Sequence, residues 1–249
     1  MILVESAVDL ATPTGSMRTH VYRPADTKRR YPGLVLFSEI YQRTGPIARL
    51  AALLAGHGFV VAVPEIFHEL EAPGTVLAYD PDGTARGNAD KIGKPVAAYD
   101  ADARATIDHL LAAAVTSGHV GAMGVCIGGH LAFRAALDPR VEASACFYAT
   151  DLHKGSLGQG GDDSLARAGD IRGELLMVWG RQDPHIPEDG RALIRRRLAD
   201  ANLTFAWHEV NAQHAFLRDE GPRYDPALAR WSHGMCIELF TRVLACART

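Results

Sequence analysis

The sequence predicts an α/β fold with a mainly parallel central sheet, and three observations support this. Short apolar runs of strand length alternate with segments of helical periodicity along the whole chain. The runs at 33–37 and 59–64 are continuously apolar, as strands covered on both faces are, and residues 46–57 between them have helical spacing. At 249 residues the chain can bury a substantial core without a disulfide or metal. We therefore expect a single domain over residues 1–249, with helices on both faces of the sheet.

The other elements follow in a regular order. Alternating segments at 3–10 and 17–23 flank Pro13-Thr14-Gly15 and predict an N-terminal antiparallel hairpin. Two polar stretches, 65–94 and 151–173, predict long loops, which are often functional. The remaining strands are expected at 120–125, 143–148, 174–179 and 203–210, and the remaining helices at 97–115, 129–137, 189–200 and 227–247.

The composition narrows the classes of function. The formal net charge is −3 without blocks of like charge, which argues against nucleic acid or an anionic membrane as partner. The four cysteines form no CxxC pair, so neither a zinc site nor a disulfide framework is indicated. No N-terminal signal peptide and no apolar run of membrane-spanning length is evident. We expect a cytoplasmic protein, monomeric or homodimeric, that acts on a small molecule without metal or other cofactor.

The segment Gly124-Val-Cys-Ile-Gly-Gly129 follows a predicted strand and opens a predicted helix. It has the G-x-nucleophile-x-G pattern of the α/β-hydrolase elbow, with Cys126 in place of the usual serine. Glycines allow the sharp turn, and the N-terminus of the following helix favours a thiolate. The alternative for Cys126 is a small buried cysteine beside a glycine-rich turn. Cys146, Cys236 and Cys246 lie within a predicted strand or helix, and we interpret them as core residues.

An acid and a base follow the elbow in the order that this fold uses. Asp183 lies in a loop after the strand predicted at 174–179, where a carboxylate can orient an imidazole. His214 follows the strand predicted at 203–210 and is the candidate base. The alternatives are that Asp183 belongs to an ordinary Asp-Pro turn and that His214 has only a structural role. For the oxyanion, the elbow geometry predicts the backbone N–H of Ile127 as one donor, and the loop after residue 37 should supply the other.

With these residues in place, the chain resembles the dienelactone hydrolase (carboxymethylenebutenolidase) family of α/β-hydrolases over most of its length. The cysteine elbow is its most specific feature, because most α/β-hydrolases carry serine there. The supporting segments are 37–41, 72–75, 124–129, 180–183 and 214–218.

The resemblance implies roles for further residues. Glu39 matches the glutamate that contacts the resting cysteine and helps to control its ionisation, and the N–H of Ile40 matches the second oxyanion donor. Arg218 matches an arginine that holds the substrate's carboxylate, and Arg86 is a looser match for another. A solvated ion pair is the alternative for either arginine.

Two departures from the family pattern flank the expected site. Residues 64–69 read Pro-Glu-Ile-Phe-His-Glu, where the family commonly has aspartate and then tyrosine, and the polar stretch at 151–173 is long. Glu65, His68 and Tyr41 are therefore candidate pocket-lining residues, and the departures bear on the substrate more than on the chemistry.

The leading hypothesis is a hydrolase that cleaves a small anionic lactone or ester through a thioester on Cys126. A second keeps Cys126, His214 and Asp183 but expects a general carboxylester, thioester or amide as substrate. A third, from another class, is a non-catalytic relative that binds a small ligand. Loss of one of the three residues would favour the third, and all three are present.

Overall fold

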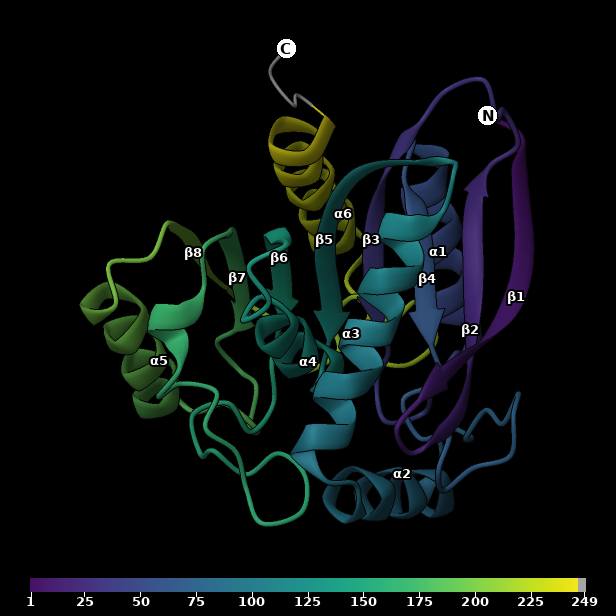
Figure 1. The fold of residues 1–249 in the computed structure, drawn as a ribbon. Coiled ribbons are helices and arrows are strands. Elements are labelled where there is room, and N and C mark those ends of the chain that lie inside the picture. Colours follow the sequence, from purple (N-terminus) through teal and green to yellow (C-terminus); the bar gives the residue numbers. More distant parts are fainter. Residues whose placement is uncertain (246–249) are drawn as a thin grey trace.

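The computed structural model describes residues 1–245, which contain an eight-stranded sheet in the order β1-β2-β4-β3-β5-β6-β7-β8 (Figure 1). The three pairs at the β1 end run antiparallel, antiparallel and parallel, and every later pair is parallel. The predicted α/β-hydrolase architecture, including the N-terminal hairpin, is therefore confirmed. The strands are β1 (Leu3–Thr12), β2 (Gly15–Pro24), β3 (Tyr31–Phe37), β4 (Val60–Pro64), β5 (Thr116–Val125), β6 (Val141–Phe147), β7 (Glu174–Gly180) and β8 (Phe205–Val210).

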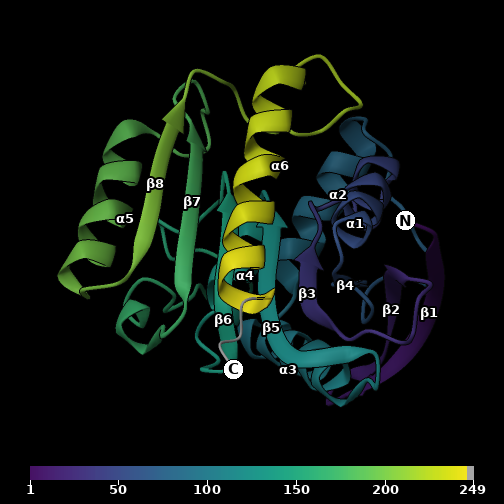
Figure 2. The ribbon, with the colours of Figure 1, turned by 90° about the horizontal axis from the view of Figure 1, so that it is seen from above.

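Helices cover both faces of this sheet. Figures 1 and 2 show α3 and α4 on one face and α1 and α6 on the other. The central strands are buried on both sides because their residues are almost all apolar: every residue of β3 and β4 is buried. The α-helices are α1 (Gly45–Gly56), α2 (Pro81–Gly93), α3 (Val96–Ala112), α4 (Ile127–Ala135), α5 (Glu188–Asp200) and α6 (Pro226–Phe240).

Helix α2 corrects the prediction of one long loop over 65–94. Its start has a clear local cause: Pro81 occupies the first turn, and the Asp80 carboxylate accepts a hydrogen bond from the N–H of Gly83 at 2.7 Å. Only two of its residues, Gly83 and Gly87, are buried, so the apolar periodicity that marks most helices is missing. The second stretch, 151–173, is irregular apart from the short 3₁₀ turn η1 (Ala168–Asp170), as predicted.

The last helix is shorter than predicted. Helix α6 ends at Phe240 and continues as one π-helical turn, η2 (Thr241–Ala245). Trp231 on this helix is 40% exposed, whereas Cys236 and Leu239 are buried. Cys246, which we expect to be a core residue, lies outside the described residues.

Across residues 1–245, no helix combines the length and the apolar character needed to cross a bilayer.

The Asp80 cap is testable by substitution. Asp80→Ala should lower the free energy of unfolding by about 1 kcal/mol, because it leaves the N–H groups of the first turn of α2 without their acceptor. Urea denaturation measures this change. Asp82→Ala, in the same turn but without a capping role, is the control and should have a clearly smaller effect; equal effects of the two would contradict the assigned cap.

Candidate active site

Cys126 stands at a sharp turn between β5 and α4. Its backbone has φ 61° and ψ −124°, a conformation that L-residues rarely adopt. The turn requires its glycines: a Cβ on Gly124 would lie 1.8 Å from the carbonyl oxygen of Gly128, and a Cβ on Gly128 would lie 2.2 Å from that of Phe37. The Cys126 side chain is only half-buried, whereas Cys146 and Cys236 are fully buried. Burial raises the pKa of both of these thiols.

The half-buried cysteine lines a cavity of about 240 Å³ at the carboxyl ends of the parallel strands. This is the edge of a doubly covered α/β sheet where ligands usually bind. Six predicted site residues share the cavity wall with other polar groups. They are Cys126, Glu39, Ile40, Tyr41, His214 and Arg218.

His214 is hydrogen-bonded to Asp183. Its Nδ1 lies 2.6 Å from Oδ2 of Asp183, and the other carboxylate oxygen of Asp183 accepts the backbone N–H of His185 at 2.9 Å. This fixes the ring and directs Nε2 away from Asp183. Burial alone would lower the pKa of His214, but the negative charge of the Cys126 thiolate and the bond to Asp183 raise it to about 10. The hydrogen bond to Asp183 and the nearby Cys126 sulfur therefore favour the protonated form of the imidazole.

Two backbone N–H groups are available near the cysteine. Ile127 is the first residue of α4, so its N–H has no acceptor within the helix. The N–H of Ile40 donates to no other backbone group of residues 1–245, and Ile40 lines the cavity. These are the two amides predicted to bind an oxyanion.

Glu39 is a buried carboxylate held by two groups. Its Oε2 lies 3.8 Å from a guanidinium nitrogen of Arg218 and accepts the hydroxyl of Tyr79 at 3.4 Å. Burial raises the pKa of Glu39, and the charge of Arg218 opposes that rise. Within residues 1–245 no hydrogen bond joins Glu39 to Cys126. In this resting arrangement the partner of Glu39 is therefore an arginine and not the thiol.

Arg218 is enclosed by aromatic rings. Its guanidinium carbon lies 4.3 Å from the ring centroid of Tyr79 and 5.7 Å from that of Tyr41. Its side chain is only 11% exposed, and Glu39 is its one carboxylate partner within 4 Å among the described residues. A planar group with five donors and a single loose partner can still bind an anion.

Two predicted substrate-binding residues lie elsewhere. Arg86 points away from the cavity and pairs with the buried carboxylate of Glu71 through two 2.5 Å contacts. His68 is enclosed in a charged cluster, with its Nε2 3.0 Å from Asp102. The structure corrects the predictions for Arg86 and His68, for two different reasons. Helix α2, which was not recognised in the sequence, directs Arg86 to Glu71. His68 lies before α2 in the chain and contacts Asp102 of α3. The candidate pocket residue Glu65 is paired outside the cavity as well: its Oε1 lies 2.9 Å from Nε2 of His20.

Helix α2 instead contributes a different set of residues, missed in the sequence. Thr84, Asn88 and Lys91 line the cavity from α2. Lys91 pairs with Asp151 at 2.7 Å, so α2 is tied to the irregular 151–173 segment. A spacing of three or four residues along a helix would have grouped these side chains, had the helix been recognised.

Arg223 is the other residue that sequence reasoning missed. It lines the cavity, is half-buried, and pairs with no carboxylate of residues 1–245. It follows Arg218 by five residues in a loop with no regular pattern, so no sequence signal singled it out. Arg218 and Arg223 place two guanidinium groups at a cavity that also holds the cysteine.

Two groups of side chains have the composition of a metal site, but each is otherwise engaged. Asp183, His185 and His214 offer ligand atoms within 4.8 Å of one another, and the Asp183–His214 hydrogen bond already uses two of them. In the second group, the buried Lys94 ammonium already bonds to Asp102 and Glu69. That ammonium supplies the positive charge that a metal ion would bring.

Comparisons with known proteins agree with one another. The model of the Dienelactone hydrolase family matches residues 17–244. A Saccharomyces cerevisiae protein named "Putative carboxymethylenebutenolidase" is 40% identical, covering 98% of this chain and 93% of its own. The carboxymethylenebutenolidase of Pseudomonas sp. strain P51 is 26% identical, covering 92% and 91%. Among solved structures, one titled "Putative Dienelactone Hydrolase" from Klebsiella pneumoniae aligns with a TM-score of 0.79 at 20% identity, over 97% of this chain and 100% of its own.

The charge coupling between Cys126 and His214 predicts a titration. In Cys126→Ala the negative charge that raises the pKa of His214 is gone, so this pKa should fall from about 10 by more than one unit. NMR titration of the histidine ring signals measures it. Cys146→Ala, which removes a thiol from the core, is the control and should leave the His214 titration in place. An unchanged pKa in Cys126→Ala would show that the two groups are not coupled.

Proposed function

Because this chain belongs to the dienelactone hydrolase family, we propose that it hydrolyses a small anionic lactone or ester through a thioester on Cys126. The observation that carries the proposal is that Cys126, His214 and two incompletely paired guanidinium groups line one cavity. Cysteine and imidazole supply nucleophile and acid–base chemistry, and the arginines supply recognition of a carboxylate.

In the first half of the proposed reaction, the Cys126 thiolate attacks the carbonyl carbon of the ester. The N–H groups of Ile40 and Ile127 hold the oxyanion that forms. When the tetrahedral intermediate collapses, the carbon–oxygen bond to the leaving group breaks. The leaving alkoxide takes the proton of the His214 imidazolium, which is the proton that the Cys126 thiol gives up when the thiolate forms. The product of this half is a thioester and a neutral imidazole.

In the second half, neutral His214 removes a proton from a water molecule that attacks the thioester. The carbon–sulfur bond breaks, the acid product leaves, and the thiolate–imidazolium pair is restored. Asp183 keeps the ring oriented throughout through its 2.6 Å hydrogen bond. One water is consumed for each ester bond cleaved, and no cofactor is required.

In this proposal, the negative charge of the substrate acts on the ion pair between Glu39 and Arg218. A substrate carboxylate that binds Arg218 competes with Glu39 for the same guanidinium. Burial already raises the pKa of Glu39, and weakening its attraction to Arg218 raises it further. In this proposal Glu39 then becomes a better acceptor for the proton that the Cys126 thiol gives up, and it relays that proton to His214 when the substrate is bound. An anionic substrate is therefore favoured in this proposal over a neutral ester.

The nucleophile is tested by Cys126→Ala, which should lower kcat/KM on a reactive aryl ester by at least about a thousandfold, because no other group replaces the thiolate. Steady-state hydrolysis of the purified variant measures it. The control is Cys146→Ala, whose activity should stay close to wild type. Wild-type activity in Cys126→Ala would exclude the thioester route.

The proposed carboxylate recognition separates the anionic from the general substrate class. Arg223→Ala should raise KM for an anionic lactone by about tenfold and change KM for a neutral ester little, because only the anion needs the guanidinium. Arg86→Ala, which removes a guanidinium that points away from the cavity, is the matched control. If Arg223→Ala affected both substrate classes equally, a general carboxylesterase would be the better assignment.

A further inference from the structure

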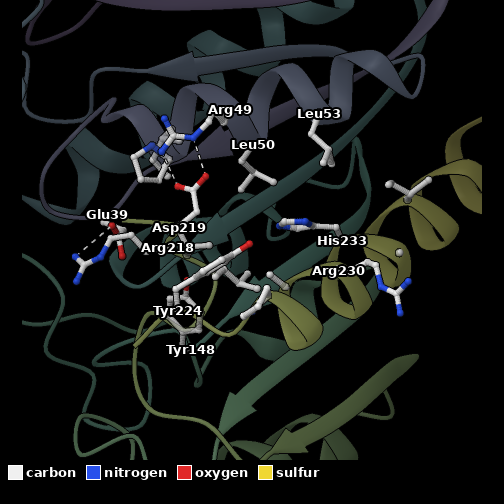
Figure 3. Close-up of a pocket in the computed structure, with 18 of the residues that line it drawn as sticks. Glu39, Arg49, Leu50, Leu53, Tyr148, Arg218, Asp219, Tyr224, Arg230 and His233 are labelled. Atoms are coloured by element: carbon white, nitrogen blue, oxygen red, sulfur yellow. Dashed lines mark hydrogen bonds and ion pairs between the residues drawn. The ribbon is translucent and has the colours of Figure 1, made fainter. Parts of the chain in front are cut away.

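A second cavity, of about 420 Å³, lies between α1, α6 and the 217–226 segment (Figure 3). Its volume is within the range of small-molecule sites, and such sites are mostly apolar with a few polar groups. Leu50 and Leu53 of α1 line one side, and His233 and Arg230 of α6 line the other. Seven further lining residues are apolar: Pro46, Ile47, Val125, Leu217, Pro226, Ala229 and Ile237.

The two cavities share part of their wall. Glu39 and Arg218 line both of them. Tyr148 lines the second cavity, and its ring packs edge-on against His214 at a centroid distance of 5.0 Å. The second cavity is thus separated from the first by the same groups that surround the cysteine and its histidine.

The charged groups of the second cavity are unequally paired. Arg49 is fully engaged by Asp219, through contacts of 2.7 and 2.6 Å, and by Glu220. Arg230 is exposed and pairs with no carboxylate of residues 1–245. Burial lowers the pKa of His233, so its ring is neutral at pH 7. One unpaired positive charge therefore lies beside an apolar interior.

We propose that this cavity is a second ligand site, which binds a monoanionic amphiphile such as a medium-chain carboxylate. The hydrocarbon part lies against Leu50, Leu53 and Ile237, and the anionic head lies at Arg230. Apolar burial supplies the affinity, and the guanidinium excludes cationic ligands and favours anionic ones. The proposal goes beyond ester hydrolysis, because binding here needs neither Cys126 nor turnover.

The probe is octanoate, measured by isothermal titration with the full chain at pH 7. Octanoate should bind with a dissociation constant below about 1 mM. Leu53→Trp, which fills the cavity, should weaken binding by about tenfold or more. Leu193→Trp is a matched control, since Leu193 is an equally exposed helical leucine outside the cavity: the two side chains are 36% and 37% exposed. Two results would overturn the proposal. One is no binding of octanoate at about 10 mM, roughly ten times the expected limit. The other is equal weakening of binding by Leu53→Trp and Leu193→Trp.

The head group and the identity of the cavity are tested separately. Arg230→Gln should weaken octanoate binding several-fold and leave binding of neutral 1-octanol nearly unchanged, with the exposed Arg196→Gln as control.

Octanoate should also still bind after Cys126 is alkylated with iodoacetamide, which fills the catalytic cavity. Loss of octanoate binding on alkylation, with Leu53→Trp unaffected, would place the ligand in the catalytic cavity and overturn the second site. Esterase activity that survives the alkylation, with octanoate still bound, would count against the proposed hydrolysis alone.

Discussion

The turn at Cys126 is the constraint on which the rest of the site depends. The chain passes from β5 to α4 so sharply that Gly128 lies against the end of β3, where a Cβ would come within 2.2 Å of Phe37. A positive φ at a non-glycine residue costs on the order of 1–3 kcal/mol, so the surroundings must hold it in place. They do so through the main chain, because the N–H of Cys126 donates to Phe147 and its carbonyl oxygen accepts the N–H groups of Gly129 and Thr150.

Further strained residues surround the same cavity. Tyr148, Asp151 and Ala215 also have positive φ angles, and each lies at the cavity or against His214. Strain of this kind persists where packing determines the backbone, and the neighbouring strands here are buried at the centre of the sheet. The fold therefore supplies the free energy that fixes the cysteine, the histidine and the two free amides in one arrangement.

The sequence predicted the parts of this arrangement that depend on local pattern. The elbow glycines, the apolar strands and the order of Cys126, Asp183 and His214 all have signals in adjacent residues. The alternation of strands and helices predicted the mainly parallel sheet, and the N-terminal pattern predicted the hairpin, whereas the strand order comes from the structure alone. A polar helix such as α2 has no such signal, because it packs through Gly83 and Gly87 and not through an apolar stripe.

The misplacement of Arg86 has the same cause. A Cβ on Gly87 would lie 2.5 Å from the carbonyl oxygen of Ile40, so α2 approaches the loop after β3 more closely than any larger residue allows. This contact fixes which face of α2 lines the cavity: Lys91 faces inward, and Arg86 faces Glu71. Sequence spacing gives the relative positions of side chains on one helix, but not its rotation against a neighbour.

The buried ionisable groups of the site also depend on neighbouring opposite charges. Glu39 and His214 are nearly or fully enclosed, and a buried ionised group is tolerated only when an opposite charge lies close by. Arg218 provides that charge for Glu39, and it does so at 3.8 Å, without a close hydrogen bond. An anion can therefore approach this guanidinium without first breaking a close hydrogen bond to Glu39. Glu39 and Arg218 line both the cavity that contains Cys126 and the pocket between α1 and α6, so an anion in either one would lie beside the same ion pair.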